Sequence, residues 1–390
     1  MKALLIGCGQ MGFVHLQRLL ANQYIQEVII VEPDKHRRQK IAEQFIESPI
    51  ILFERLNEAL ACYDTENAGP GICVIASNSA LHGEHVSKII SKFNHYTRPP
   101  LLFVEKPLLE NIFELETITP QLFSYRGNLI GGYLLRYSWA SQLLIEYLVA
   151  HKLKIISIDV IWTKSIVPDR TSPGVLVDET THAIDFIWSY LLPRSGFSFS
   201  DAPFEILSLE GIRSNAVIDV QKQYALYGTL TPPVLAELKY QFLANGYYQR
   251  NQKHKISIKG YSSFISPSYE RSVRVLCTGN VTIECQFDMG KKDHFFVYKD
   301  NIEMIQHSFR VDKVEKEINH AITYQLNFHD KGPAADLSDM IKVIKLIHEV
   351  EQKLLSSSAH KYMNQQSQEQ VTWKKKGHGL DPVDPSPSFK

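Results

Sequence analysis

The sequence predicts an α/β chain in two parts, because the spacing of its apolar residues changes near residue 150. Over the first 130 residues, short apolar runs of strand length alternate with helical stripes, which is typical of parallel β-α-β units. From about residue 155, apolar and polar residues alternate, as in 156–162, which indicates a strand with one buried face. We therefore expect a parallel sheet with helices, followed by a second domain whose sheet is mostly antiparallel.

The first part opens with a glycine-spaced turn between a strand and a helix. The apolar run 3–6 leads directly into Gly7-Cys8-Gly9-Gln10-Met11-Gly12, and a helical stripe follows. Gly7 permits a tight turn, Gly9 leaves bare backbone for a pyrophosphate, and Gly12 lets the helix approach the strand. The helix N-terminus also offers free N–H groups to phosphates. We therefore predict a dinucleotide site that includes Gly7, Gly9, Gln10, Met11 and Gly12.

An acidic residue ends the next strand, where the adenosine ribose of a dinucleotide would be recognised. The apolar run 28–31 ends on Glu32, twenty residues after Gly12. A carboxylate there can accept both ribose hydroxyls and would repel a 2′-phosphate, which favours NAD as the cofactor. Lys35, Arg37 and Arg38 follow closely, so NADP stays open as the less favoured choice.

Two further strand ends carry polar side chains. Ser77-Asn78 follows the run 72–76, and Glu105-Lys106 follows the run 101–104. Ligands of parallel sheets sit at the carboxyl ends of the strands, so we expect these loops to share one crevice with the glycine turn. A lysine at such a crevice can donate to a substrate hydroxyl, although a lysine after a strand is more often a surface residue. We predict no metal site, and we predict cofactor contacts at Ser77, Asn78, His82, Glu105 and Lys106.

A second group of reactive side chains begins a helix that we predict to end near residue 192. Asp178 and His182 lie four residues apart and share one face of a helix. A histidine beside a carboxylate can exchange protons near neutral pH, which hydride removal from a secondary alcohol requires. The alternatives are a helix-capping aspartate and a structural histidine. Asp185, on the same face, is expected to support the imidazole from behind.

The same patterns divide the chain into three segments. We predict a nucleotide-binding domain over 1–130, a substrate-binding and oligomerisation domain over 131–355, and a polar, flexible tail over 356–390. Thr278-Gly279-Asn280 is expected to join two strands as a hairpin. Strand-like runs of the second domain lie near 204–208, 216–230, 234–242, 255–260, 272–277, 281–287 and 294–298.

Size, charge and cysteine content exclude several classes of protein. The chain has 390 residues, which is long enough for two substantial cores. Its 42 basic and 42 acidic residues leave no net charge, so we expect no nucleic-acid partner. Its longest apolar runs fall short of the roughly 20 residues of a bilayer span, so we expect no membrane partner. The five cysteines are scattered without a CxxC pair, which predicts reduced thiols in a cytoplasmic protein.

Together these motifs resemble the glucose-fructose oxidoreductase, inositol dehydrogenase and rhizopine-catabolism (Gfo/Idh/MocA) family over residues 1 to about 355. The resemblance rests on the glycine turn and its helix with His15, on the segments 77–85 and 132–137, on Glu105-Lys106-Pro107, and on 174–185. The chain departs from the family at Thr180, where the family has a glycine, and at Ser172-Pro173-Gly174, where the family has a glycine-rich entry to the helix. Both departures border the expected substrate cavity.

The resemblance implies an N-terminal Rossmann domain and a C-terminal α+β domain with a large, open, mostly antiparallel sheet. It also implies a nicotinamide cofactor, a sugar, inositol or nucleotide-sugar substrate, and a dimer or tetramer formed through the second sheet. By the same resemblance, Lys106, Asp178 and His182 form the catalytic set. His182 is then the general base, Lys106 binds the reacting hydroxyl, and Asp178 positions and tunes both.

Three functions are compatible with these residues. The first is an NAD(P)-dependent oxidoreductase that acts on a secondary alcohol of a carbohydrate or cyclitol. The second is a non-catalytic NAD-binding regulator of the same fold, since a fold does not fix a function. The third is a lyase or glycosidase that uses bound NAD for transient oxidation. We predict the first, with Arg136, Trp162 and Arg170 lining its substrate cavity.

Overall fold

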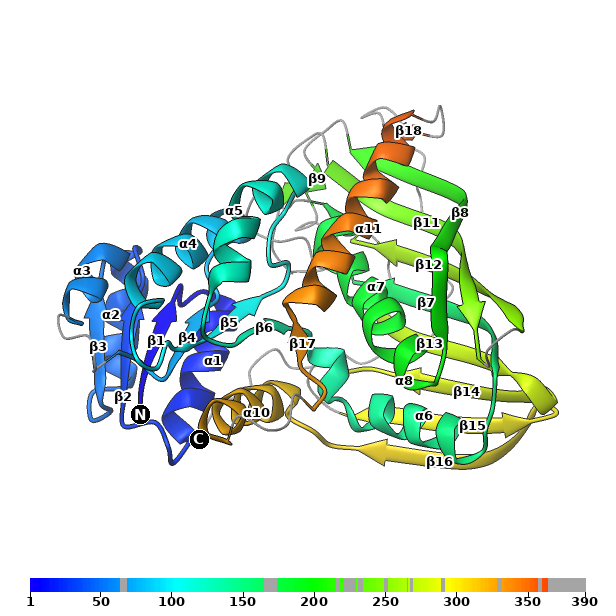
Figure 1. Ribbon diagram of the computed structural model, residues 1–390, viewed down its shortest axis with the longest axis horizontal. Helices are drawn as coiled ribbons and strands as arrows, with labels where there is room; N and C mark the ends of the chain where they lie inside the picture. The colour runs from blue at the N-terminus through cyan, green and yellow to red at the C-terminus, as the bar shows by residue number, and fades with distance from the viewer. Residues whose placement is uncertain are drawn as a thin grey trace.

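The computed structural model contains two large β-sheets, with helices packed around the first and along one side of the second (Figure 1). The first sheet lies in the N-terminal half, drawn from blue to cyan, and most of the remaining chain builds the second. The structure describes residues 1–63, 69–164, 174–214, 218–219, 229–230, 234–248, 252–264, 266, 269–288, 292–327, 332–356 and 360–363.

The first sheet has seven strands in the order β17-β6-β5-β4-β1-β2-β3. All but β17 run parallel, which confirms the predicted parallel sheet, and most are nearly continuous apolar runs because both of their faces are covered. The strands are β1 (Lys2–Ile6), β2 (Glu27–Val31), β3 (Ile50–Phe53), β4 (Ile72–Ile75), β5 (Leu101–Glu105), β6 (Leu129–Gly132) and β17 (Ala335–Asp336).

Helices occupy every crossover between these parallel strands. They are α1 (Gln10–Ala21), α2 (Lys35–Gln44), α3 (Leu56–Ala61), η1 (Ser79–Leu81), α4 (His82–Phe93) and α5 (Ile112–Ser124). The strand order reverses at β1, which lies between β2 and β4. Sheets of this topology bind ligands outside the carboxyl ends of the strands at that reversal. The glycine turn and the loops after β4 and β5 lie there, as predicted.

The second sheet has nine strands in the order β16-β15-β14-β13-β7-β12-β11-β8-β18. Every neighbouring pair is antiparallel except β12 with β7 and β18 with β8, which confirms a mostly antiparallel sheet. The strands are β7 (Ile155–Thr163), β8 (Ser198–Ser214), β11 (Val234–Tyr247), β12 (Lys253–Ser263), β13 (Glu270–Cys277), β14 (Val281–Gln286), β15 (Asp293–Lys299), β16 (Ile302–Phe309) and β18 (His360–Met363).

The sequence prediction of this sheet is right for most strands and incomplete at its edge. A hairpin joins β13 to β14 through η5 (Thr278–Asn280), where Gly279 and Asn280 have φ of 74° and 55°, as predicted. β16 was not predicted. Most of the run predicted at 216–230 lies outside the described residues, and its described parts form a separate pair, β9 (Ile218–Asp219) with β10 (Thr229–Leu230).

One side of the second sheet is covered by helices that face the first sheet (Figure 1). The helix that carries the predicted catalytic residues is at the centre of this layer. It is one continuous segment made of η3 (Leu176–Thr180), α7 (Thr181–Ile184), η4 (Asp185–Leu191) and α8 (Leu192–Arg194). The other helices of the layer are η2 (Leu134–Tyr137), α6 (Trp139–Ala150) and α11 (Leu337–Ser356).

A late segment of the chain returns to the first sheet. Helix α10 (Lys313–Asn327) buries Ile318 and Ile322 completely, in one apolar cluster with Leu5 of β1 and Phe103 of β5. β17 then pairs with β6. The first sheet is therefore completed by residues that follow most of the second sheet in sequence.

The prediction of a flexible tail from residue 356 is wrong for its first part. α11 continues through Ser356, and β18 pairs in parallel with β8, from His360 opposite Gly211 to Met363 opposite Ser214. Pairing with the edge strand β8 thus orders this segment, although its polar composition predicts flexibility. Residues 357–359 and 364–390 lie outside the described part of the chain.

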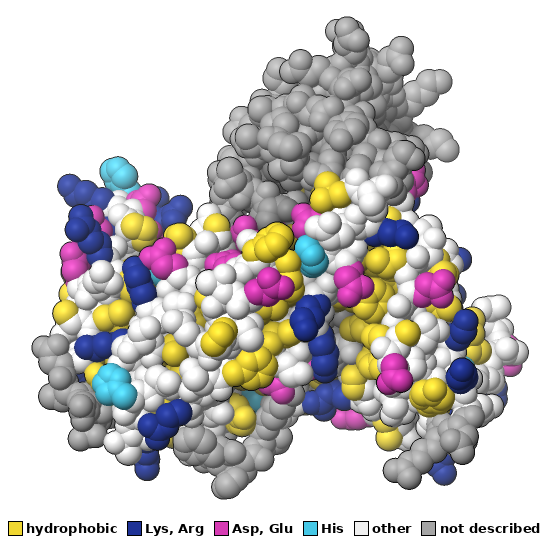
Figure 2. Space-filling view, turned by 45° about the horizontal axis from the view of Figure 1, so that its top comes forward, with side chains coloured by type: hydrophobic (Ala, Val, Ile, Leu, Met, Phe, Trp, Pro, Cys, Tyr) yellow, Lys and Arg dark blue, Asp and Glu magenta, His cyan; other side chains and the backbone are white. Residues whose placement is uncertain are grey.

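Charges of both signs are mixed on the surface. Figure 2 shows basic and acidic side chains interspersed over one face of the molecule, in keeping with the balance of 42 and 42. Within the described ranges, no helix is both long and apolar enough to cross a membrane.

Candidate active site

The glycine turn has the shape that a bound pyrophosphate requires. Gly7 has a φ of +83°, and a Cβ there would lie 2.5 Å from the Cα of Ser77. A Cβ on Gly12 would lie 2.0 Å from the carbonyl oxygen of Gly7. By contrast, the nearest atom to a Cβ on Gly9 is Nη1 of Arg37, at 4.0 Å. Gly7 and Gly12 are thus required by the fold, whereas the space over Gly9 is left for a ligand.

The N-terminus of α1 faces the same space. Gly9 is the N-cap residue and provides no side chain to accept hydrogen bonds from the first turn, in which Gln10 and Met11 are not buried. Uncapped N–H groups at a helix start attract phosphate. The residues of this turn therefore fit a dinucleotide pyrophosphate.

Two substitutions separate these roles. Gly9→Ala is expected to leave the free energy of unfolding within about 1 kcal/mol of the parent, because its methyl group approaches no protein atom closer than 4.0 Å. It is expected to weaken dinucleotide binding at least about tenfold, because it occupies the ligand's space. Gly12→Ala is expected to destabilise the protein by more than about 2 kcal/mol through its clash with Gly7. Denaturant unfolding and fluorescence titration with NAD measure the two effects. Equal loss of stability in both variants would contradict this assignment.

Glu32 directly follows β2 beside the glycine turn, as predicted, and its carboxylate is buried there. One oxygen accepts the backbone N–H of Cys8 at 2.8 Å, and the other accepts that of Asp34 at 3.0 Å. Nη1 of the half-exposed Arg37 lies 3.7 Å from the same carboxylate. Each carboxylate oxygen keeps a second lone pair, so the site retains acceptor capacity for ribose hydroxyls.

The loops after β4 and β5 are tied together by His82. Its Nδ1 lies 2.7 Å from the carbonyl oxygen of Pro107, and its Nε2 lies 3.2 Å from that of Ser77. Burial lowers the pKa of His82, so the ring is neutral and donates one proton, to the closer carbonyl. The predicted cofactor contact at His82 stays a prediction. His82 holds the two loops in place, and the Asn78 side chain caps η1 by accepting the N–H of Ala80.

Glu105 also has a partner within the fold. Its Oε1 lies 2.5 Å from Nε2 of His15 on α1, and its Oε2 accepts the backbone N–H of Lys106 at 3.3 Å. Burial alone would raise the pKa of Glu105, but the hydrogen bond and charge of His15 bring it below its usual value. The pair joins the helix of the glycine turn to β5. Glu105 thus orients the Lys106 loop, and its predicted contact with the cofactor stays a prediction.

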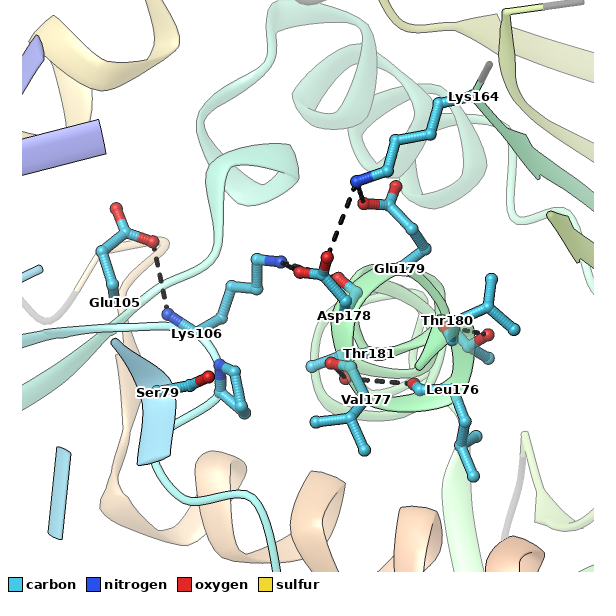
Figure 3. A network of polar contacts seen from close by, with 12 residues as sticks. Ser79, Glu105, Lys106, Lys164, Leu176, Val177, Asp178, Glu179, Thr180 and Thr181 are labelled. Carbon is cyan, nitrogen blue, oxygen red and sulfur yellow. Dashed lines mark hydrogen bonds and ion pairs between the residues drawn. The ribbon is translucent and has the colours of Figure 1, made fainter. Parts of the chain in front are cut away.

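Lys106 and Asp178 meet where the two halves of the molecule adjoin. The Nζ of Lys106 donates to Oδ1 of Asp178 at 2.7 Å and to the carbonyl oxygen of the same residue at 2.6 Å (Figure 3). Burial lowers the pKa of Lys106, but the Asp178 and Glu179 carboxylates outweigh it and raise the pKa above its usual value. Lys106 is therefore an ammonium group that donates two of its three protons to Asp178, and among the described residues no hydrogen bond of the third is seen.

The helix that carries Asp178 is widened into π turns around Thr180, the residue that stands where the resemblance implies a glycine. Leu176–Thr180 and Asp185–Leu191 are both π-helical. The Thr180 hydroxyl donates to the carbonyl oxygen of Val175 at 3.1 Å, and the Thr181 hydroxyl donates to that of Val177 at 2.5 Å. Threonine hydroxyls thus hydrogen-bond carbonyl groups in the widened helix. Single π turns are frequent at functional sites.

His182 lies one helical turn beyond Asp178, as predicted, and is almost completely buried. Its ring packs against the indole of Trp162, with 5.7 Å between the centroids. Within the described residues no hydrogen bond to the imidazole is present. Burial lowers the pKa of His182 well below its usual value, and the positive charges of Lys106 and Arg271 lower it further. The imidazole is therefore neutral at pH 7 and can accept a proton.

The prediction that Arg136 contacts substrate is wrong. Its guanidinium group is 1% exposed and is bound by the carboxylate of Asp185, through Nε at 2.9 Å and Nη2 at 2.6 Å. Nη1 donates to Asp339 at 3.0 Å and to the carbonyl oxygens of Pro333 and Ala334. The expectation that Asp185 supports the His182 imidazole is therefore wrong, because the Asp185 carboxylate binds Arg136 instead. The cluster is structural and connects η2, η4 and α11.

The other two predicted substrate contacts have different outcomes. Trp162 is fully buried between His182 and Arg271, whose guanidinium carbon lies 4.9 Å from the indole centroid. Its indole packs against the His182 ring. Arg170 lies outside the described residues.

Three charged residues of the site were not predicted from sequence. Lys164 follows β7 and lies 3.6 Å from Oδ2 of Asp178, and it also binds Glu179. Arg271 of β13 donates to Glu179 at 3.1 Å. The register of the second sheet places Arg271 directly opposite Trp162. Glu179 is the sequence neighbour of Asp178, but only the pairing of distant strands brings Lys164 and Arg271 to this pair, so no local motif identifies those two.

The N-terminal part of this arrangement matches a known family. Residues 1–122 match the model described as "Oxidoreductase family, NAD-binding Rossmann fold" (GFO_IDH_MocA). This match confirms the predicted resemblance and the class of cofactor, a nicotinamide adenine dinucleotide. A search of the curated proteins finds no match to the chain.

Over 90% or more of its length, the chain has the fold of several solved oxidoreductases. UDP-N-acetylglucosamine 3-dehydrogenase GnnA from Acidithiobacillus ferrooxidans is 14% identical, with a TM-score of 0.66 over 90% of this chain and 97% of that one. KijD10, a 3-ketoreductase from Actinomadura kijaniata solved with TDP-benzene and NADP, is 13% identical, with a TM-score of 0.67 over 93% and 98%. At this identity the likeness establishes the two-domain fold. Residues 1–122 thus match the NAD-binding Rossmann domain of the Gfo/Idh/MocA oxidoreductase family, and the remainder of the chain shares the fold of the solved oxidoreductases.

Proposed function

We propose that this protein transfers a hydride between a nicotinamide cofactor and a secondary alcohol or ketone of a sugar, cyclitol or nucleotide sugar. The observation that carries the proposal is the contact between Lys106, from the nucleotide-binding sheet, and Asp178, from the helix of the second half. The contact lies beside His182, at the edge of the sheet where the glycine turn leaves room for a dinucleotide.

Lys106 has the role of a hydrogen-bond donor to the reacting oxygen. Asp178 engages two of its protons, and the third is directed away from that carboxylate. A buried ammonium group next to an oxygen that gains negative charge stabilises the alkoxide form. The carboxylates of Asp178 and Glu179 keep Lys106 charged, which makes it a donor and unsuited to be the base.

His182 has the role of the general base. Its imidazole is neutral, and in the described part of the chain it has no hydrogen-bond partner, so a ring nitrogen is available for the hydroxyl proton of an alcohol. Trp162 packs against the ring and excludes water from one of its sides. In the reverse direction the protonated imidazole returns the proton to a ketone oxygen. A bound nicotinamide ring supplies the carbon that accepts or releases the hydride.

We infer a preference for NAD from the charge of Glu32. Its buried carboxylate lies at the turn where the adenosine ribose is expected, and a 2′-phosphate there would meet a negative charge. Arg37 is the nearest cation to that carboxylate. NADP therefore competes for this site through Arg37 and is expected to bind more weakly.

A thermal-shift screen tests both proposals. The protein is heated with NAD or NADP, alone and with a panel of sugars, inositols and nucleotide sugars. A ligand at 100 times its dissociation constant adds about 2.7 kcal/mol to the free energy of unfolding. Each stabilising compound is then incubated with protein and cofactor while the absorbance of reduced nicotinamide is followed. Cofactor binding without reduction on any compound would favour the regulator, and turnover without added cofactor would favour the lyase or glycosidase.

We propose that the protein forms a dimer or tetramer through the outer face of the second sheet. Half-buried aromatic rings of β15 stack along this face, with centroids 6.1 Å apart for His294 and Phe296 and 6.2 Å apart for Phe296 and Tyr298. A second copy of the same sheet is the partner that we propose for these half-buried rings. Sedimentation velocity tests the proposal: Phe296→Glu is expected to yield monomers, and Phe113→Glu, at an exposed position of α5, is expected to leave the parent assembly intact. A parent protein that sediments as a monomer would contradict it.

We further propose a cytoplasmic location. All five cysteines are free thiols, and four of them are buried, which suits a reducing compartment. Fractionation of cells that produce the protein tests this, with recovery outside the cytoplasmic fraction as the opposing result.

A further inference from the structure

The carboxylate of Asp178 lies between two lysines that come from different parts of the chain. Lys106, after β5, binds Oδ1 at 2.7 Å, and Lys164, after β7, lies 3.6 Å from Oδ2. Figure 3 shows the two ammonium groups approaching Asp178 from separate directions, with the helix of Asp178 seen end-on. Each carboxylate oxygen therefore has its own cation.

Lys164 is itself held in place. Its ammonium group binds Oε1 of Glu179 and lies 4.7 Å from the centroid of the Phe264 ring. The other oxygen of Glu179 accepts a hydrogen bond from Arg271 at 3.1 Å. The side chains of Lys106, Asp178, Lys164, Glu179 and Arg271 thus alternate in charge, and none is more than 15% exposed. We call these five residues the charge chain.

Resting on the function proposed above, we propose that Lys164 is a positioning residue of the active site, which fixes the Asp178 carboxylate and thereby the direction in which Lys106 presents its free proton. A carboxylate with one cation can rotate about its terminal bond, whereas one with a cation on each oxygen cannot without losing a contact. Lys164 touches neither reacting atom in this role. It acts through Asp178.

Lys164 also contributes to the electrostatic environment of His182. The charged groups that face this imidazole are Lys106 after β5, Arg271 on β13, Lys164 after β7, and Asp178 on the same helix. Burial is the main reason that the pKa of His182 is low, the three cations lower it further, and Asp178 raises it. Removal of the Lys164 charge leaves Asp178 less compensated. The pKa of His182 then rises.

Kinetics with Lys164→Met provide the first test. We expect kcat to fall by about ten- to a hundredfold, because a misdirected donor slows the reaction without abolishing binding, and the dissociation constant of NAD to stay within about twofold of the parent. We also expect the acidic limb of kcat/KM against pH to move to higher pH, by up to about one unit. A residue that served only for stability would lower kcat without moving this limb.

Two further variants make this test specific. Lys164→Arg keeps a cation between Asp178 and Glu179 and is expected to recover most of the activity and the parent pH profile. Lys259→Met removes an exposed lysine of β12 and is the matched control, with no effect expected on either. Should the methionine variant fail to fold, Lys164→Gln removes the charge with less change in polarity, and the same expectations apply.

Titration of His182 gives a readout that does not require a known substrate. In full-length protein with ¹³C-labelled histidine, the His182 signal is assigned by its loss in His182→Asn and followed against pH. Its midpoint is expected to be higher in Lys164→Met than in the parent, Lys164→Arg and Lys259→Met. An unchanged midpoint overturns the proposal, and so does a shifted midpoint with unchanged kcat in an active enzyme. A shifted midpoint in a protein that turns over no substrate supports the charge chain and refutes the proposed function instead.

Discussion

Lys106→Ala is expected to lower kcat by about 10²–10⁴ while the affinity for NAD stays nearly unchanged. The ammonium group of Lys106 donates to Asp178, and we expect the dinucleotide phosphates to be bound by the glycine turn instead, so its loss should leave their contacts in place. It does remove the donor that we propose for the reacting oxygen. The loss therefore affects the transition state far more than cofactor binding.

Steady-state kinetics and a fluorescence titration with NAD measure the two quantities. Lys88→Ala is the matched control, since Lys88 is an exposed lysine of α4 whose partner Glu84 lies one turn away on the same helix. We expect it to behave as the parent protein. Full activity of Lys106→Ala would reject the assignment of this residue, and a large loss of NAD affinity would place Lys106 in the cofactor site instead.

Arg136→Met is expected to lower the free energy of unfolding by about 3–5 kcal/mol. The substitution leaves the carboxylates of Asp185 and Asp339, both buried, without the guanidinium that binds them. It also leaves the carbonyl oxygens of Pro333 and Ala334 without a donor. Loss of one partner from a buried ionic cluster is costly, because the remaining charges cannot regain contact with water.

Urea unfolding of the parent and the variant gives this difference. Arg18→Met is the control, because the pair of Arg18 and Asp312 is about one-third exposed and is expected to contribute less than about 1 kcal/mol. Arg136→Met/Asp185→Asn is expected to be more stable than the two single losses added together, since it removes both charges at once. A loss below about 1 kcal/mol in Arg136→Met would show that the cluster is hydrated.

The parts of the site that sequence predicts are those in which a local signal fixes the structure. Gly7, Gly9 and Gly12 have distinct steric roles at fixed spacing, and the structure confirms a Rossmann turn with the acid of β2 beside it. Asp178 and His182 are four residues apart on one helix, so their proximity follows from helical geometry alone. Their catalytic roles are still a prediction.

The errors arise where a side chain is bound by a residue far away in sequence. Arg136 resembles a substrate ligand in the sequence, because nothing local reveals Asp339, 203 residues further on. Lys164 resembles an ordinary lysine at a strand end until β13 brings Arg271 and helix η3 brings Glu179 beside it. β18 is similar, since its order comes from pairing with β8 and not from its own composition.

The return of α10 and β17 to the first sheet has a consequence for how the protein is made. The first sheet gains its seventh strand only after residue 336 has been synthesised. Until α10 has also been synthesised, Leu5 and Phe103 of the nucleotide-binding half are not covered by Ile318 and Ile322. Domains commonly fold as units during synthesis, N-terminal ones first. Here the two halves mature together, and a fragment ended at residue 130 for expression would carry a bare apolar surface and aggregate.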